Sequence, residues 1–477
     1  MTPVLYRLGG LCARRRWIVI GVWVVIVIGL ATLGRSAGSD TSDNLSLPGT
    51  DSQQATDLLS ARFPQQANGT NPVVLTAPAG KKITDSAYAK PIDDATTAFR
   101  ADPDVRDATS PLSSAGASLQ SPKDPRIATI ALNLSAAPSD LTIDDAQRIV
   151  DEADALRDAG LAVAFGGYVG QKVSKPETHS SEVVGLGMAV IVLLLTFGTV
   201  VAMGLPIATA ILGLVSGLSI ITLISHIADV PTVAPTLATM IGLGVGIDYA
   251  LFLVTRHQEQ RRAGMDTRES IARATATSGG AVVFAGTTVI VALLSLAVVG
   301  IPLVTTLGYT SAIVVLIAMS AAITLLPALL GVVGDRIDAL ALPHHKQGGD
   351  GHPHGWARWA EGVVRRPVMA TVSAVVVLAA LAIPALTLYL GQQDNGALPT
   401  STDARRAYDG MTAGFGVGSN GPLLVAVDLS AKPAGGDQPA QDPRLQTLRK
   451  DLAGAAGVQS VTQPSVNGDG SAAVLTA

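Results

Sequence analysis

Long apolar stretches alternate with ordinary polar sequence along the whole chain. A helix needs about 20 apolar residues to cross the hydrocarbon core of a bilayer. Seven stretches are long enough to span it, namely residues 17–34, 183–203, 205–227, 232–255, 280–300, 302–333 and 367–390. The sixth is longer than a span requires, and we expect its membrane helix to end near Leu330. The pattern therefore predicts a polytopic α-helical membrane protein.

Positively charged residues in short loops mark the cytoplasmic side of such a protein. They gather before the first stretch, between the fourth and fifth, and between the sixth and seventh: Arg7, Arg14, Arg15, Arg16; Arg256, Arg261, Arg262, Arg268, Arg273; Arg336, Lys346, Arg358, Arg365, Arg366. The expected membrane crossings between these groups place all three of them on the same side of the membrane. We expect an inner (plasma) membrane protein with a cytoplasmic N-terminus.

The first stretch has an alternative interpretation as a cleaved signal peptide, because Ser36, Ala37 and Gly38 offer the small residues of a cleavage site. The stretch is long, however, and it has a counterpart in the middle of the chain, where no signal peptidase would act. These two features favour a retained span.

The polar segment between the first two stretches has the pattern of a small α+β domain. Strands are expected at residues 73–75, 105–109, 126–134 and 161–165, and helices at 85–100 and 140–158, with Asp85 as a cap of the first helix. The order βαββαβ is that of a ferredoxin-like fold. We therefore expect an extracytoplasmic ferredoxin-like domain here.

An internal repeat relates this segment to the tail. Asp43, Asn44, Leu47 and Pro48 recur as Asp394, Asn395, Leu398 and Pro399, and after a one-residue gap Asp51, Ala55, Asp57, Phe63, Asn68 and Gly69 recur as Asp403, Ala407, Asp409, Phe415, Asn420 and Gly421. Residues 458–464 match 105–111, and 473–475 match 128–130. Counterparts of residues 131–333 are missing, so we expect the chain to stop inside its second repeat. Duplicated membrane cores are common in transporters.

These observations predict six regions. Residues 1–35 form a cytoplasmic segment and the first span, 36–181 the first outer domain, and 182–333 the core of spans two to six. Residues 334–366 form a cytoplasmic loop, 367–391 the seventh span, and 392–477 part of a second outer domain.

Composition narrows the function. Charged residues make up 15% of the chain, against roughly 25% in soluble domains. A net charge of −4 without a long basic tract argues against nucleic-acid binding, and the single cysteine, Cys12, excludes a disulfide framework or a cysteine metal cluster. We find no nucleotide-binding motif or nucleophile constellation, and therefore expect neither an enzyme nor a cofactor. We interpret His226 as a loop residue and the His-rich stretch of His344, His345, His352 and His354 as a linker rather than a metal site.

Asp248 carries the chemistry that the sequence suggests. It lies deep in the fourth apolar stretch, where a carboxylate costs at least about 2.5–3.5 kcal/mol and marks a proton or ion relay by default. Gly242 and Gly246 form a small-xxx-small pair that lets another helix approach, and the Tyr249 hydroxyl could donate to a carboxylate. The alternative is that Asp248 snorkels to the cytoplasm or makes a packing contact. An aspartate side chain is short and reaches water poorly from that depth, which counts against this alternative.

Residues 244–252, GVGIDYALF, followed by RHQE at 256–259, resemble the fourth-helix signature of the MmpL family of RND-type transporters. The resemblance implies twelve spans with two porter domains, a core similar to sterol-sensing domains, and export of lipids or other amphiphiles driven by protons. It implies a relay at Asp248 and Tyr249 that faces a second Asp–Tyr pair in helix ten. Gly244, Phe252 and Phe284 would support the channel; Ala285 replaces a serine of some members.

Two other functions remain open from the residues. A lipid-responsive receptor or scaffold would use the core without pumping, and a protein-secretion accessory would share the outer domain and six-span block. Asp248 within an apolar stretch favours the exporter over the receptor or scaffold. The duplication within one chain favours the exporter over the secretion accessory. The expected partners are lipid substrate, membrane lipids and protons; the resemblance leaves a homo-oligomer or accessory proteins open. We expect no transport from the chain alone, because helix ten is missing.

Overall fold

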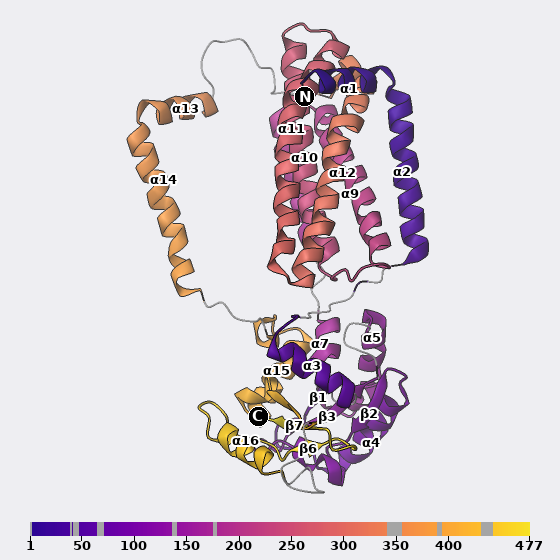
Figure 1. The fold of residues 1–477 in the computed structure, drawn as a ribbon, viewed down its shortest axis with the longest axis vertical. Helices are drawn as coiled ribbons and strands as arrows, with labels where there is room; N and C mark the ends of the chain where they lie inside the picture. The colour runs from indigo at the N-terminus through magenta and orange to yellow at the C-terminus, as the bar shows by residue number, and fades with distance from the viewer. Residues whose placement is uncertain are drawn as a thin grey trace.

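The computed structural model describes residues 2–38, 41, 47–63, 71–135, 141–174, 179–340, 355–388, 394–430 and 442–477. Figure 1 shows a bundle of long helices at one end and a mixed helix–strand part at the other. Most of the apolar stretches form the bundle, and the α/β segments lie outside it.

The long helices follow the apolar stretches. They are α2 (Arg16–Ala37), α8 (His179–Phe197), α9 (Val200–Ile224), α10 (Ala234–Arg262), α11 (Thr267–Leu294), α12 (Pro302–Val333) and α14 (Pro367–Ala382). Six of them, with short 3₁₀ extensions on three, are long and apolar enough to cross a membrane, and the apolar part of α8 is shorter, at Val183–Phe197. The described chain thus contains several membrane-spanning helices.

One predicted break between spans is wrong, and two helices extend beyond their apolar stretches. The break between the second and third stretches falls at Gly198 and Thr199 and not at residue 204, because Gly198 has a φ of +70° and Thr199 caps α9. The α10 helix runs past the apolar stretch that ends at residue 255 and continues to Arg262, and α11 begins at Thr267, ahead of the apolar stretch that starts at residue 280. Apolarity marks the lipid-facing length of a helix, whereas the helix itself continues into water wherever its backbone hydrogen bonds persist.

The last long helix is shorter than its apolar stretch. α14 ends at Ala382 and continues as a 3₁₀ turn, η4 (Ile383–Thr387), while residues 389–393 lie outside the described part. It has no buried residue and stands apart from the bundle, preceded by the amphipathic helix α13 (Gly355–Arg365).

Helix α10 packs against α9, α11 and α12. The helix α1 (Thr2–Arg14), which the sequence analysis did not predict, lies across one end of the bundle (Figure 1). Its Gly9 meets Thr275 of α11, and its Ala13 meets Gly331 of α12. The Arg16 guanidinium also donates to the Gly331 carbonyl, which fixes the start of α2 on α12.

Two units lie outside the helical bundle, and we call them the first and second outer units. The first is an antiparallel four-stranded sheet with the order β2-β3-β1-β4. Its elements are β1 (Asn71–Thr76), α4 (Ser86–Ala101), β2 (Val105–Thr109), η1 (Ser114–Leu119), β3 (Ile127–Leu134), α5 (Ile143–Asp151), α6 (Asp154–Asp158), β4 (Ala162–Phe165) and α7 (Gly167–Val173). The strand limits match those predicted to within a few residues. The second predicted helix, however, is divided into α5 and α6, and Asp85 makes no side-chain cap bond.

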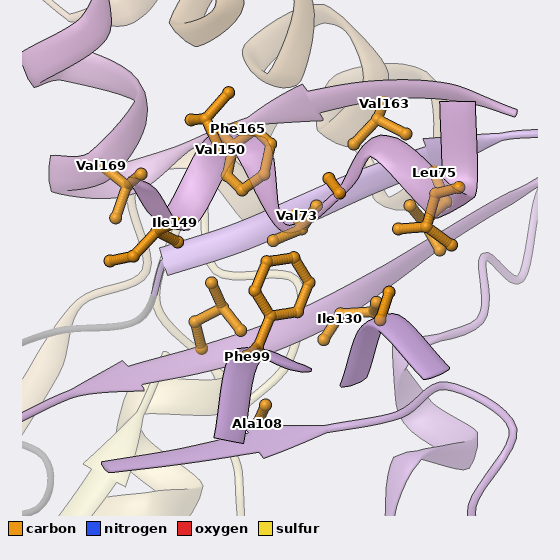
Figure 2. Close-up of a cluster of buried hydrophobic side chains, with 14 of the residues drawn as sticks. Val73, Leu75, Phe99, Ala108, Ile130, Ile149, Val150, Val163, Phe165 and Val169 are labelled. Carbon is orange, nitrogen blue, oxygen red and sulfur yellow. The ribbon is translucent and has the colours of Figure 1, made fainter. Parts of the chain in front are cut away.

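The core of this unit lies between the sheet and its helices (Figure 2). It includes Val73 and Leu75 of β1, Ile130 of β3 and Phe99 of α4, all fully buried. Phe99 and Phe165 meet edge to face, with their ring centroids 6.2 Å apart. This aromatic contact joins the helical layer to the sheet.

The second outer unit contains η5 (Asn395–Ala397), α15 (Asp403–Phe415), η6 (Val417–Asn420), β5 (Leu424–Asp428), α16 (Pro443–Ala453), β6 (Ser465–Val466) and β7 (Ala472–Thr476). Its strands form a sheet with the order β5-β7-β6. Of the repeat-matched residues, Asp43, Asn44, Asn68 and Gly69 lie outside the described part of the chain.

The two outer units exchange their repeat-related helices. α3 (Asp51–Arg62) and the residue after it pack on the second sheet, with Leu59 and Phe63 against Ala472 and Val474. Its counterpart α15 packs on the first sheet, with Ala407 against Val74, Ile127 and Ala164. Each sheet is thus covered by a helix from the other repeat, so the units are joined through their cores.

Candidate functional site

Asp248 lies at the midpoint of α10, which packs against α9, α11 and α12. The helix starts with Pro235 near its N-terminus, where a missing backbone N–H costs nothing, and it continues through a long apolar sequence. The Asp248 side chain is nonetheless exposed on the bundle surface. It makes no hydrogen bond or ion pair with any residue that the structure describes.

A stripe of exposed residues runs along this face at four-residue steps. Met240 and Phe252 are 63% and 59% exposed, and Gly244 lies between Met240 and Asp248 with nothing within 4 Å of an added Cβ. Residues four apart lie above one another on a helix. Asp248 is therefore placed on an open surface of small and apolar residues.

The opposite face of α10 is tightly packed through its other two glycines. A Cβ added at Gly242 would lie 2.7 Å from the Val314 side chain of α12, and one at Gly246 would lie 3.1 Å from Ala210 of α9. These contacts are closer than a larger side chain permits, so both glycines bring neighbouring helices against the α10 backbone.

Tyr249 turns away from Asp248 and into the bundle. It is 7% exposed and packs in the same cluster as Leu253 and Val282. Its hydroxyl lies 3.4 Å from the position of a Cβ added at Gly286 of α11, so that glycine leaves room for the phenol. The structure does not join the two side chains by a hydrogen bond, because adjacent helix positions point about 100° apart.

Phe284 lies on α11 and is 74% exposed, and its neighbour Ala285 is also exposed. Phe252 and Phe284 are thus both surface residues of the helical bundle. Sequence reasoning placed them beside a channel, and the described part of the chain leaves their outward faces uncovered.

A buried polar cluster near the C-terminal end of α10 was missed by the sequence analysis. His257 is fully buried and its Nδ1 lies 2.9 Å from the Ser270 hydroxyl of α11. Gln258 donates toward Asp338 of the 3₁₀ turn η3 (Gly334–Asp338). The sequence offered little signal, since these polar residues follow the apolar stretch and read as a solvated end. They tie α10 to α11 and to the end of α12.

A cavity of about 580 Å³ opens where the two outer units meet. Its polar lining includes Gln171, Asp394, Asn395, Tyr408 and Asn420, and its apolar lining includes Leu119, Met411 and Pro422. A hydrogen bond to Asp394 raises the pKa of Tyr408. The repeat had already singled out Asp394, Asn395 and Asn420, so recurrence was the signal that could have located this cavity.

The histidines give no metal site in the part of the chain that is described, where no three His, Cys, Asp or Glu side chains are arranged to hold an ion. His226 lies in the α9–α10 connection, and its Nε2 contacts the Gly38 carbonyl at 3.2 Å. His344, His345, His352 and His354 fall outside the described residues.

The similarity to known proteins extends over both the helical core and the outer units. The profile of the MMPL family matches residues 44–370. The whole chain aligns at 34% identity with membrane protein YdfJ of Bacillus subtilis, covering 64% of that protein. It is 29% identical to membrane protein SCO6666 of Streptomyces coelicolor, over 89% of this chain and 60% of that protein.

A third relative is the trehalose monomycolate exporter MmpL3 of Mycobacterium tuberculosis, 25% identical over 93% of this chain and 50% of that protein. The chain thus spans about half to two thirds of the length of these relatives. The family profile covers more than half of the chain and the match to YdfJ runs from end to end. With its several apolar helices and its outer α/β units, this chain belongs to the MMPL family.

Proposed function

We propose that the whole protein is a secondary active transporter that exports lipids or other hydrophobic and amphiphilic small molecules across the inner membrane, driven by the proton-motive force. The observation that carries this proposal is Asp248, exposed at the midpoint of a membrane helix and unpaired within the described residues. A carboxylate at that depth is costly and is kept where it moves ions or protons.

Asp248 and Tyr249 are the proposed proton relay. A second helix that covers the stripe of Met240, Gly244, Asp248 and Phe252 would enclose the carboxyl and give it a partner. Gly242 and Gly246 hold α10 in place on its far side, and Gly244, Phe252 and Phe284 would line the closed interface. The carboxyl would then take up a proton from one side and release it to the other.

The outer units are proposed as ferredoxin-like porter domains at residues 36–181 and 392–477. The strand order β2-β3-β1-β4 with two crossover helices supports this for the first unit. The bundle at 182–333, the loop at 334–366 and the spans within 1–35 and 367–391 complete the proposed division. The basic residues of the loops support a cytoplasmic N-terminus.

The cargo proposed is an amphiphile. The cavity between the outer units combines amide, carboxyl and phenol groups with Leu119, Met411 and Pro422, a lining suited to a ligand with a polar head and an apolar part. The similarity to MmpL3, a trehalose monomycolate exporter, supports the same class of cargo.

The test uses the full-length protein in lipid vesicles that carry an imposed pH gradient. A pH-sensitive dye inside the vesicles reports proton flux, and a fluorescently labelled phospholipid reports transfer. Asp248→Asn should abolish both signals, because the amide keeps the shape but cannot exchange a proton. Asp229→Asn is the matched control, since Asp229 is exposed at the outer end of the bundle, and it should retain both.

Two results would contradict the proposal. If Asp248→Asn moved protons and lipid at the wild-type rate, the relay would lie elsewhere. If the wild-type protein bound lipid without any proton flux, the receptor or scaffold function would be favoured instead.

A further inference from the structure

Three carboxylates pair with one guanidinium on the helical side of the first outer unit, and a fourth carboxyl lies beside them. Asp102, which ends α4, is buried; its Oδ2 accepts from Arg148 Nε at 2.8 Å and its Oδ1 from the backbone amide of Asp104 at 2.8 Å. Arg148 on α5 also pairs with the Asp104 and Asp145 carboxylates. The fourth carboxyl belongs to Glu152, one turn further along. One guanidinium therefore serves three carboxylates, with a fourth carboxyl close to Asp102.

Glu152 is the acid of this cluster that makes no ion pair with Arg148 in the described part of the chain. Its Oε2 is buried and has no hydrogen-bond partner among the described residues, while its carboxyl lies within hydrogen-bonding reach of Asp102. Two carboxyl groups in contact can share a hydrogen bond only when one of them carries a proton. Asp102 accepts from the Arg148 guanidinium, whereas Glu152 Oε2 has no hydrogen-bond partner among the described residues, so Glu152 is the carboxyl placed to carry that proton.

The charged side chains on the neighbouring elements do not neutralise Glu152 in place of that proton. On α6, Arg157 is committed to Asp154 and to the Val150 carbonyl. Asp151 of α5 accepts from Gln147, and Lys172 is the only charged residue of α7. Around α4, Arg100 pairs with Asp107. Burial, followed by the nearby Asp102 charge, raises the pKa of Glu152 to about 7.

The cluster also lies close to the helices that connect the first outer unit to the second. Helix α5 packs on α7, and α7 packs on α15 of the second outer unit (Figure 1). Ser174 at the end of α7 accepts from the Ala404 amide of α15. A change in how α5 sits on the α4–β2 turn would therefore reach the contact between the two outer units.

We propose that Glu152 is a proton-operated latch: protonated, it closes a carboxyl pair with Asp102 that holds α5 against the α4–β2 turn, and deprotonated, it repels Asp102 and loosens α5 and α7. Because the pKa of Glu152 is raised in the folded protein, the proton's contribution to stability is fully present below the ordinary glutamate pKa. It is lost as the pH rises through about 7. The latch would thus make the outer units sense the pH of their compartment.

The test is hydrogen–deuterium exchange on the full chain in detergent at pH 6 and pH 8.5, with each rate divided by the intrinsic exchange rate at that pH. In the wild-type protein, protection of residues 141–174 should fall several-fold, on the order of tenfold at most, between the two values. Glu152→Gln keeps a neutral hydrogen-bonding group and should show no such fall. Asp151→Asn, one residue away and exposed, should keep the wild-type response.

Infrared spectroscopy of the wild-type protein gives a second measurement that needs no variant to fold. A protonated carboxyl band should disappear with a midpoint near pH 7. The latch is overturned if that band is missing at pH 6, if wild-type protection does not change with pH, or if Glu152→Gln keeps the wild-type pH response.

Discussion

Ser174, in the first outer unit, accepts a hydrogen bond at 2.9 Å from the backbone amide of Ala404, 230 residues away in the second. The first-turn amides of a helix have no partner within that helix. Thr402, at the N-cap of α15, makes no side-chain cap bond. Ser174 therefore supplies to α15 a cap that its own repeat does not provide, at the point where the two units meet.

Removing this cap should weaken the contact between the outer units. Ser174→Ala leaves the Ala404 amide buried without a partner, which costs about 1–2 kcal/mol. We expect faster limited proteolysis around residues 394–402 and a lower midpoint of thermal unfolding. Ser118→Ala, an exposed serine of the same unit, should leave both unchanged. Equal proteolysis of the two variants would show that the bond does not hold α15.

Thr199 fixes the corner between α8 and α9. Its hydroxyl donates to the Ile337 carbonyl at 3.0 Å and accepts from the Ala202 amide at 3.4 Å. Thr199→Val keeps the shape and loses both bonds, so we expect a loss of about 1–2 kcal/mol, visible as a lower unfolding temperature in detergent. Thr199→Ser retains the hydroxyl and should stay close to wild type. A serine variant as unstable as the valine variant would instead point to packing of the methyl group.

Gly246 and Gly244 offer a matched pair on opposite faces of α10. Gly246→Leu forces a side chain against Ala210 and should destabilise the bundle by about 1–3 kcal/mol. Gly244→Leu enters open space and should be neutral or slightly stabilising, because leucine is the better helix former. Thermal unfolding of the purified chain measures both. A strongly destabilised Gly244→Leu chain would mean that this face is already covered.

Cys12, the only cysteine, reports on the docking of α1. It is 2% exposed, and burial raises the pKa of its thiol, so a maleimide should react slowly with the native chain at neutral pH. Gly9→Val should speed labelling at least tenfold, because its Cβ would lie 2.6 Å from Thr275 Oγ1 and push α1 off the bundle. Gly10→Ala meets Ala272 at an ordinary 3.8 Å and should label like wild type. Identical rates for all three would place the thiol outside the α1 interface.

The sequence alone determined which segments enter the membrane, the strand and helix order of the first outer unit, and the position of Asp248. These features depend on composition and periodicity within one segment, such as the apolar length around Asp248 or the alternation in residues 127–134. The repeat was readable for the same reason, since it compares local patterns. Local patterns also misplaced the corner at Gly198, where a single positive φ outweighs a continuous run of apolar residues.

Only the tertiary structure decided which partner each element meets. It turned Asp248 outward and Tyr249 inward, buried His257 against Ser270, and exchanged α3 and α15 between the outer units. It also brought Glu152 to Asp102, 50 positions earlier in the chain. Such contacts depend on how whole faces pack against one another, and no local pattern carries that information, because an apolar stripe fits any complementary apolar surface.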